Sequence, residues 1–144
     1  MIIRKAKVAD LGEIEKLNEK YFKEIRDFKE IIEDKSSYFI ICLEKNKIVG
    51  FSGIKHSDWN NTANVINIFI HPSFRNIGLA SKLLDKLKQE ARRLKVRALV
   101  AESPSLNSAL PFYLKNGFRI CGFNDRYYSN NGKEIAMFLS FDLK

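Results

Sequence analysis

The chain has 144 residues, of which 45% are hydrophobic and 29% charged, a composition typical of a globular domain with a buried core. The longest uninterrupted apolar run, residues 38–43, is far too short to cross a bilayer, which excludes a helical membrane protein. The formal net charge of +8 indicates an anionic partner without distinguishing nucleic acid, a membrane surface or a phosphorylated small molecule. Basic residues on solvated helix faces would explain this charge equally well.

Cysteine and histidine usage indicates a cytoplasmic protein without a metal. The first residues, MIIRKAKVAD, show no secretory signal peptide. Cys42 and Cys121 lie far apart in apolar, strand-like runs, and we expect both thiols to be buried and reduced. His56 and His71 have no neighbouring cluster of cysteine, histidine or acidic residues that would complete a metal site, so we expect none.

Strand and helix patterns alternate along the first half of the chain. Residues 2–5 predict a strand, and Asp10 with Glu13 predicts an acidic capping box that opens a helix reaching Tyr21. A second helix is predicted where apolar residues recur every three or four positions, at Ile25, Phe28, Ile31 and Ile32. Residues 37–44 and 47–54 predict a hairpin around positions 45–47, and residues 65–70 predict the next strand.

The second half of the chain predicts two helices and three strands. Residues 79–94 predict a helix with one apolar face, made by Leu79, Leu83, Leu87, Ala91 and Leu94. A strand over 96–102 follows, and then a helix over 108–115 that ends at Asn116 and Gly117. Residues 118–128 and 133–141 predict a final hairpin. This order predicts one α/β domain over residues 1–144, in which a mixed sheet carries helices on its faces.

The junction between the strand at 65–70 and the helix at 79–94 reads HPSFRNIGLA and resembles an anion site in its composition. Pro72 ends the strand, so the helix begins with unpaired N–H groups and the positive end of its dipole. Gly78 carries no Cβ and Ala80 only a methyl, so an anion can approach the amides of residues 76–80, with Arg75 beside them. A pyrophosphate fits this chemistry, although a glycine that only relieves a tight turn gives the same pattern. A Walker loop and a three-glycine dinucleotide motif are both absent from the sequence.

Two motifs resemble those of the GCN5-related N-acetyltransferase (GNAT) family. HPSFRNIGLASKLL resembles motif A at its defining positions, Arg75, Gly78 and Ala80. ALPFYLKNGF resembles motif B at Ala109, Tyr113, Gly117 and Phe118. The opening, IIRKAKVADLGEIEKL, resembles the first strand and helix of the family, so the resemblance covers nearly the whole chain. It implies a mixed, mostly antiparallel sheet flanked by helices on both faces.

The resemblance implies an acetyl-CoA-dependent N-acetyltransferase, in which a primary amine attacks the acetyl group directly in a ternary complex. The coenzyme would bind at Arg75, Asn76, Ile77, Gly78, Leu79 and Ala80. The strand backbone around Ile68 would pair with pantetheine, and an amide at Ile70 would meet the acetyl carbonyl. Tyr113 holds the position of the general acid that protonates the departing thiolate. Without the resemblance, a core aromatic beside Phe112 would explain Tyr113 equally well.

Two positions depart from the family pattern. Many members carry a glutamate on the motif A strand, where this chain has Asn64 and Asn67, so we assign no general base. Glu102 is a fallback, and it is equally an ordinary charge at a strand end. The asparagine that holds pantetheine three residues before Ala109 is replaced by Leu106. Asn107 either takes over that contact or caps the following helix.

Two other classes of function stay open. A non-catalytic acyl-CoA-binding module would account for the missing carboxylate, and a basic nucleic-acid binder would account for the cations and aromatics of NDRYY and RRLKVR. We expect acetyl-CoA and an amine acceptor as partners, the acceptor being a small molecule or a protein N-terminus or lysine. We do not expect nucleic acid or a membrane, and a homodimer is left open. Acidic residues between positions 21 and 35 would either attract a cationic amine or only balance the neighbouring lysines.

Overall fold

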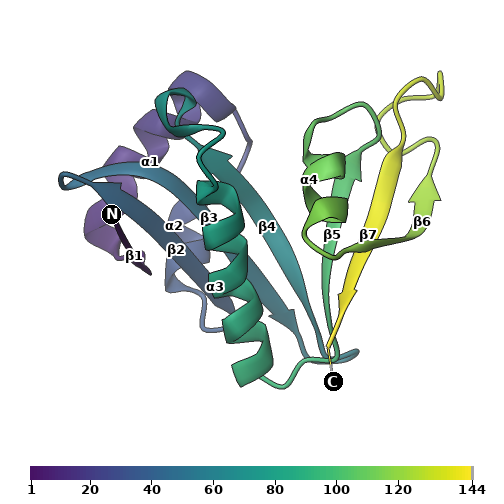
Figure 1. Cartoon of the computed structure of the whole chain (residues 1–144), viewed down its shortest axis with the longest axis horizontal. Coiled ribbons are helices and arrows are strands. Elements are labelled where there is room, and N and C mark those ends of the chain that lie inside the picture. Colours follow the sequence, from purple (N-terminus) through teal and green to yellow (C-terminus); the bar gives the residue numbers. More distant parts are fainter. Residues whose placement is uncertain (144) are drawn as a thin grey trace.

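The computed structural model describes residues 1–143, which form a seven-stranded sheet in the order β1-β2-β3-β4-β5-β7-β6 (Figure 1). The strands are β1 (Ile2–Lys5), β2 (Ser37–Glu44), β3 (Lys47–Ser57), β4 (Thr62–Ile70), β5 (Ala98–Pro104), β6 (Arg119–Asn124) and β7 (Ala136–Asp142). Neighbouring strands run antiparallel, except that β4 and β5 are parallel. The predicted order of strands and helices along the chain is confirmed.

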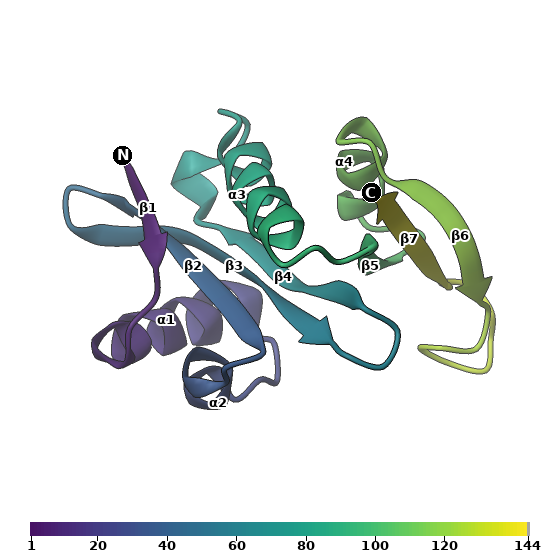
Figure 2. The same cartoon turned by 90° about the horizontal axis from the view of Figure 1, so that it is seen from below.

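Helices cover both faces of this sheet, as the resemblance implies (Figure 2). One face carries α1 (Leu11–Leu17), continued by a π-helical turn (Asn18–Phe22), and α2 (Phe28–Glu33); the other carries α3 (Leu79–Arg93) and α4 (Ala109–Lys115). The α1–α2 pair packs on one hydrophobic core, and the α3–α4 pair packs on another. The predicted apolar stripe of α3 is buried at Leu79, Leu83, Leu87 and Ala91. No helix within residues 1–143 is long and apolar enough to span a membrane.

Four local expectations are wrong. Asp10 and Glu13 form no capping box, because Asp10 pairs with Arg4 and Glu13 accepts a hydrogen bond from the Ile48 amide, at 2.7 Å. Ile25 precedes α2 and is fully exposed. The strand predicted over 118–128 ends at Asn124, so residues 125–135 form a loop between β6 and β7. Cys121 is exposed rather than buried, because β6 is an edge strand; Cys42 is buried as expected.

The parallel pair β4–β5 is the short joint of the sheet. Its register extends only over Thr62–Ala98, Ala63–Leu99 and Asn64–Val100. Beyond Asn64 the two strands diverge, as Figure 1 shows at the end away from the C-terminus. A β-bulge lies at the same level of β4, where Ser52 pairs with Ile68 but Ile54 with Val65. Bulges of this kind re-aim side chains and end regular pairing. The divergence leaves facing edges of β4 and β5 without strand partners.

Candidate active site

A cleft of about 1400 Å³ opens where β4 and β5 separate. Its walls are the unpaired edges of these two strands, the loop before α3, α4, β7, the segment between α1 and α2 and the loop between β6 and β7. Pockets for drug-sized ligands usually measure roughly 300–1,000 Å³, so this cleft has room for a larger molecule. It is the candidate site.

The loop before α3 presents a row of free backbone donors at one end of the cleft. Asn76 and Gly78 both have positive φ angles, 63° and 82°. The amides of residues 76–81 donate to no carbonyl within the described part of the chain. The first four amides of any α-helix lack an intrahelical partner, and here the loop before α3 adds further unpaired amides. The array, with the positive end of the α3 dipole, can hold a phosphate or pyrophosphate.

Arg75 both supports this loop and faces the cleft. Its Nε donates to the carbonyl oxygen of Ile70 at 3.0 Å, which ties the loop to the end of β4. Guanidinium has five N–H donors in a fork, so further donors stay available to an anion. Asn107, at the far wall, uses its Oδ1 to accept from the Ala109 amide at 2.8 Å. This bond satisfies the first amide of α4, although the N-cap position itself is Ser108. Asn107 also lines the cleft, and its Nδ2 has no partner among residues 1–143.

All the residues predicted for the site line this cleft except Ile77. Ile77 is 59% exposed and does not line the cleft. The nine that do line it are Ile68, Ile70, Arg75, Asn76, Gly78, Leu79, Ala80, Asn107 and Tyr113. They come from β4, the loop before α3, α3 itself and the region of α4. The structure thus brings together residues spread over 46 sequence positions (68 to 113, both ends included).

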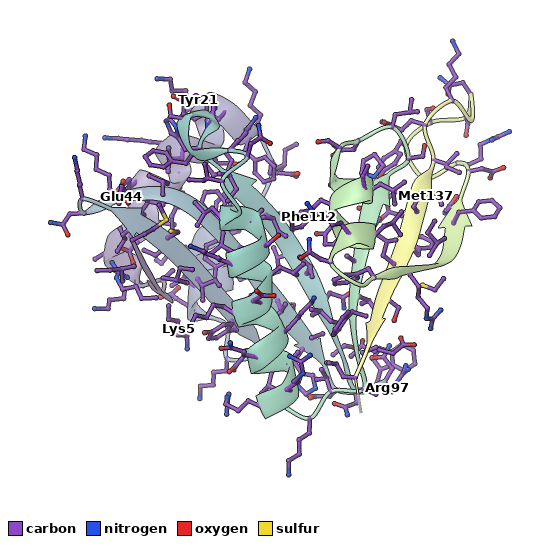
Figure 3. All side chains as sticks on the ribbon, in the orientation of Figure 1. Lys5, Tyr21, Glu44, Arg97, Phe112 and Met137 are labelled. Carbon is purple, nitrogen blue, oxygen red and sulfur yellow. The ribbon has the colours of Figure 1, made fainter. Side chains whose placement is uncertain are left out.

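Tyr113 lies on α4 with its ring in the core and its edge at the cleft. It is 6% exposed, and its ring packs edge-on against Phe112 and Phe118 at centroid distances of 5.4 and 5.1 Å. Figure 3 labels Phe112 on the same helix. Burial, and then the negative charge of Glu102, raise the pKa of the Tyr113 phenol far above its usual value. A phenol is protonated near neutral pH even at its usual pKa, so the proton that a donor needs is present.

Asn67 is a buried side chain without a partner. It is 7% exposed, lines the cleft from β4, and neither its Nδ2 nor its Oδ1 has a hydrogen-bond partner among the described residues. Buried amides are nearly always hydrogen-bonded, because an unpaired one costs free energy. This residue departs from the glutamate of the family pattern, and its unpaired amide marks a place where a ligand or water can bind.

The opposite wall carries a carboxylate and aromatic rings that sequence reasoning did not place together. The Tyr128 hydroxyl, from the loop between β6 and β7, donates a hydrogen bond to the Glu102 carboxylate of β5. Burial is the main cause that raises the pKa of the Tyr128 phenol, and the hydrogen bond to Glu102 raises it further. Tyr127 and Phe138 line the cleft beside them. The only signal in the sequence was the NDRYY stretch, which resembled a nucleic-acid contact instead.

The cleft is open to both faces of the sheet. Ile68 and Ile70 pack with the α3 core, whereas Phe69 packs with the α1–α2 core. Since side chains alternate along a strand, Asn67 shares the α1–α2 face with Phe69. Glu102 likewise points away from Ala101, which belongs to the α3 core, and its cross-strand partner is Phe138. The free amides and Tyr113 thus serve one side of the cleft, and Asn67 and Glu102 the other.

A smaller hollow of about 330 Å³ lies on the sheet near the β4–β5 joint. Its two arginines already have partners. Arg97 Nε donates to the Asn60 carbonyl at 2.7 Å, and Arg119 pairs with Asp142 at 3.0 Å. We therefore place the candidate site in the larger cleft. Within residues 1–143, no three cysteine, histidine or acidic side chains come together as a metal site.

Sequence comparison relates this chain to a family of known proteins. The family model described as "Acetyltransferase (GNAT) family" matches residues 7–118. The chain is 30% identical over 131 residues to streptothricin acetyltransferase A of Bacillus subtilis (strain 168), which covers 86% of this chain and 75% of that protein.

Solved structures agree with the sequence comparison. A crystal structure from Bacillus anthracis str. Ames, described as a streptothricin acetyltransferase in complex with acetyl coenzyme A, has a TM-score of 0.77 and 29% identity. That match covers 86% of this chain and 72% of the other. The ribosomal-protein-S18-alanine N-acetyltransferase of Escherichia coli has a TM-score of 0.85 over 99% of this chain and 94% of that one; at 20% identity, it shows a shared fold.

Proposed function

Because the chain belongs to the GNAT acetyltransferase family, we propose that it transfers the acetyl group of acetyl-CoA to a primary amine by direct attack in a ternary complex. The observation that carries this proposal is the cleft, which joins a row of free amides at the start of α3 to a buried phenol on α4. The alternative of a non-catalytic binding module would need the amides but not the phenol.

The coenzyme would bind on the α3 side of the cleft. The pyrophosphate would accept hydrogen bonds from the amides of residues 76–81 and from Arg75. Pantetheine would lie along the free edge of β4 around Ile68 and pair with it like an added strand. Asn107 Nδ2 is a further donor at the cleft wall.

The acetyl group would then lie near the end of β4, between the two faces of the cleft. The acceptor must lose a proton to water to become a nucleophile. Its nitrogen then attacks the thioester carbonyl and releases a second proton to water as the amide forms. A carbon–nitrogen bond forms, the carbon–sulfur bond breaks, and CoA leaves as a thiolate. Tyr113 would donate its phenolic proton to that sulfur, since a phenol is protonated near neutral pH, and the phenolate would then regain a proton from water. The backbone amide of Ile70, or of a neighbour on β4, would stabilise the negative charge on the carbonyl oxygen.

The proposal is tested by binding and by turnover. At ~100 times its Kd, CoA should raise the free energy of unfolding by about 2.7 kcal/mol, seen as a rise in Tm. Release of free thiol from acetyl-CoA is then followed with a panel of amines: streptothricin, 1,4-diaminobutane, a peptide with N-terminal alanine, and a lysine peptide. No thermal response to saturating CoA would refute the proposal. A clear response without thiol release from any amine would favour the non-catalytic binding module.

A further inference from the structure

The cleft has a second half, on the α1–α2 face, that the coenzyme as placed above leaves free. Its polar groups include Asn67 from β4, Glu102 from β5 and Tyr128 from the loop between β6 and β7. The segment before α2 adds the charged residues Glu24 and Arg26. The aromatic rings of Phe22, Tyr127 and Phe138 surround them. A carboxylate and an amide within an aromatic wall form an environment suited to a cation that carries an apolar chain.

Asn67 indicates that something polar belongs in this half. Within residues 1–143, the Nδ2 and Oδ1 atoms of its amide group are both buried and unpaired, so the folded protein without ligand bears the cost of desolvating them. Its backbone is fixed, because the Asn67 carbonyl accepts from the Ser52 hydroxyl across the bulge. The side chain is therefore held at the point where β4 leaves β5. The Oδ1 can accept a hydrogen bond from an N–H donor placed there.

Glu102 supplies the charge. It lies on the same face as Asn67, opposite Phe138 on β7, and it lines the cleft. Among residues 1–143 this carboxylate accepts one hydrogen bond, from Tyr128, which leaves acceptor capacity for another donor.

We infer that Glu102 and Asn67 bind the nitrogen of the acceptor, an aliphatic amine that arrives as an ammonium ion, and that Tyr128 is a positioning residue that orients the Glu102 carboxylate. This inference rests on the proposed function. Glu102 offers the charged hydrogen bond and Asn67 Oδ1 the neutral one, so the nitrogen is held between β5 and β4. Arg26, from the segment before α2, also lines the cleft; its Nη2 donates to the Ile66 carbonyl at 2.7 Å, and among residues 1–143 it forms no ion pair with Glu102.

The experiment uses the full chain and the amine of the panel that releases most thiol. In Glu102→Gln the acceptor KM should rise about 10- to 100-fold, the usual worth of a hydrogen bond to a charged group, while CoA affinity by calorimetry stays unchanged. Asp125→Asn is the matched control, because it removes one carboxylate from the nearby loop outside the cleft, where Asp125 pairs with Arg126 at 3.4 Å. It should leave the acceptor KM as in the wild type.

Tyr128 is tested through Glu102. Tyr128→Phe should raise the acceptor KM roughly two- to tenfold in the wild-type background, as expected for one net hydrogen bond. It should add nothing in the Glu102→Gln background, because residues that act through one another are not additive. Additive effects of the two substitutions would refute the positioning role.

Asn67 gives a readout that does not depend on turnover. Asn67→Leu keeps the approximate shape and removes two unpaired buried atoms, so Tm without ligand should rise while kcat/KM for the amine falls about tenfold. Wild-type kcat/KM in this variant would show that Asn67 does not bind the acceptor. If the wild type turns over an amine but Glu102→Gln has an unchanged acceptor KM, this inference fails and the proposed function stands. If no amine is turned over by the wild type, both fail.

Discussion

The Nε atom of Arg75 donates a hydrogen bond of 3.0 Å to the carbonyl oxygen of Ile70, which joins the loop before α3 to the last residue of β4. The same side chain thus connects the two segments proposed to hold the pyrophosphate and the acetyl carbonyl. A change at Arg75 should therefore affect the coenzyme more than the fold, because the residue itself is exposed.

Arg75→Glu should weaken CoA binding about 10- to 100-fold, since it replaces a charge-assisted hydrogen bond by repulsion. Calorimetry at several salt concentrations measures the affinity, which should also depend less on salt than in the wild type. Lys86→Glu makes the same change of charge on the exposed side of α3, outside the cleft, and should have little effect. Equal losses in the two variants would indicate a general charge effect instead of a site.

Gly78 and Gly12 form a matched pair for testing the loop. A Cβ added at either position meets no atom within 4 Å, but Gly78 has a φ of +82° whereas Gly12 lies in α1. Gly78→Ala should lower the free energy of unfolding by about 1–2 kcal/mol because of left-handed strain. Gly12→Ala should raise it by about 0.5–1 kcal/mol. Urea unfolding measures both values, and CoA affinity should fall only in the Gly78 variant; a neutral Gly78→Ala would contradict the strained loop.

Tyr113→Phe tests the proton donor. The substitution keeps the aromatic packing against Phe112 and Phe118 but removes the hydroxyl. Turnover should fall by roughly two to four orders of magnitude, the usual contribution of a positioned acid, while CoA affinity is retained. Tyr38→Phe is the control, since burial also raises the pKa of Tyr38, which lies outside the cleft. Wild-type kcat in Tyr113→Phe would return this residue to a purely structural role in the core.

Asp10 predicts a dependence of stability on pH. The hydrogen bonds from Arg4, at 2.9 Å, and from the Lys7 amide, at 2.7 Å, hold the pKa of this carboxyl below its usual value. A lowered carboxyl pKa stabilises the fold above the unfolded-state value, about 3.9, and this stabilisation is lost as the pH falls through the folded-state pKa. The Tm of Asp10→Asn should therefore lie below that of the wild type near neutral pH and converge with it in acid. A constant difference at all pH values would contradict the assignment.

The sequence predicts most of the fold because its elements have strong periodicity. The apolar stripe of α3 and the runs of β2 and β3 depend on local spacing, and the structure has them at nearly the expected bounds. The motif A loop could likewise be located from Pro72, Arg75 and Gly78 alone. Exposure of Ile25 and Cys121 could not be read locally, since it depends on which segments remain uncovered once the sheet is assembled.

The acceptor half of the cleft illustrates the limit of local reasoning. Glu102 and Tyr128 are 26 positions apart and meet only because β7 pairs with both β5 and β6. The loop that carries Tyr128 has no periodicity, so its course depends on contacts made at a distance. Glu13 is a second case, since its carboxylate accepts from the Ile48 amide, 35 positions away, in place of capping its own helix.

The short β4–β5 joint has a consequence for local stability. Three residue pairs connect the half of the sheet formed by β1 to β4 with the half formed by β5 to β7. Backbone amides on the facing edges beyond Asn64 and Val100 lack the ladder that protects the strands on their other sides. In native-state hydrogen exchange they should exchange early, well before the amides of the β2–β3 ladder. A ligand that paired with these edges would slow that exchange and link the two halves of the sheet. The hydrogen bonding across the sheet would then be continuous only in the complex.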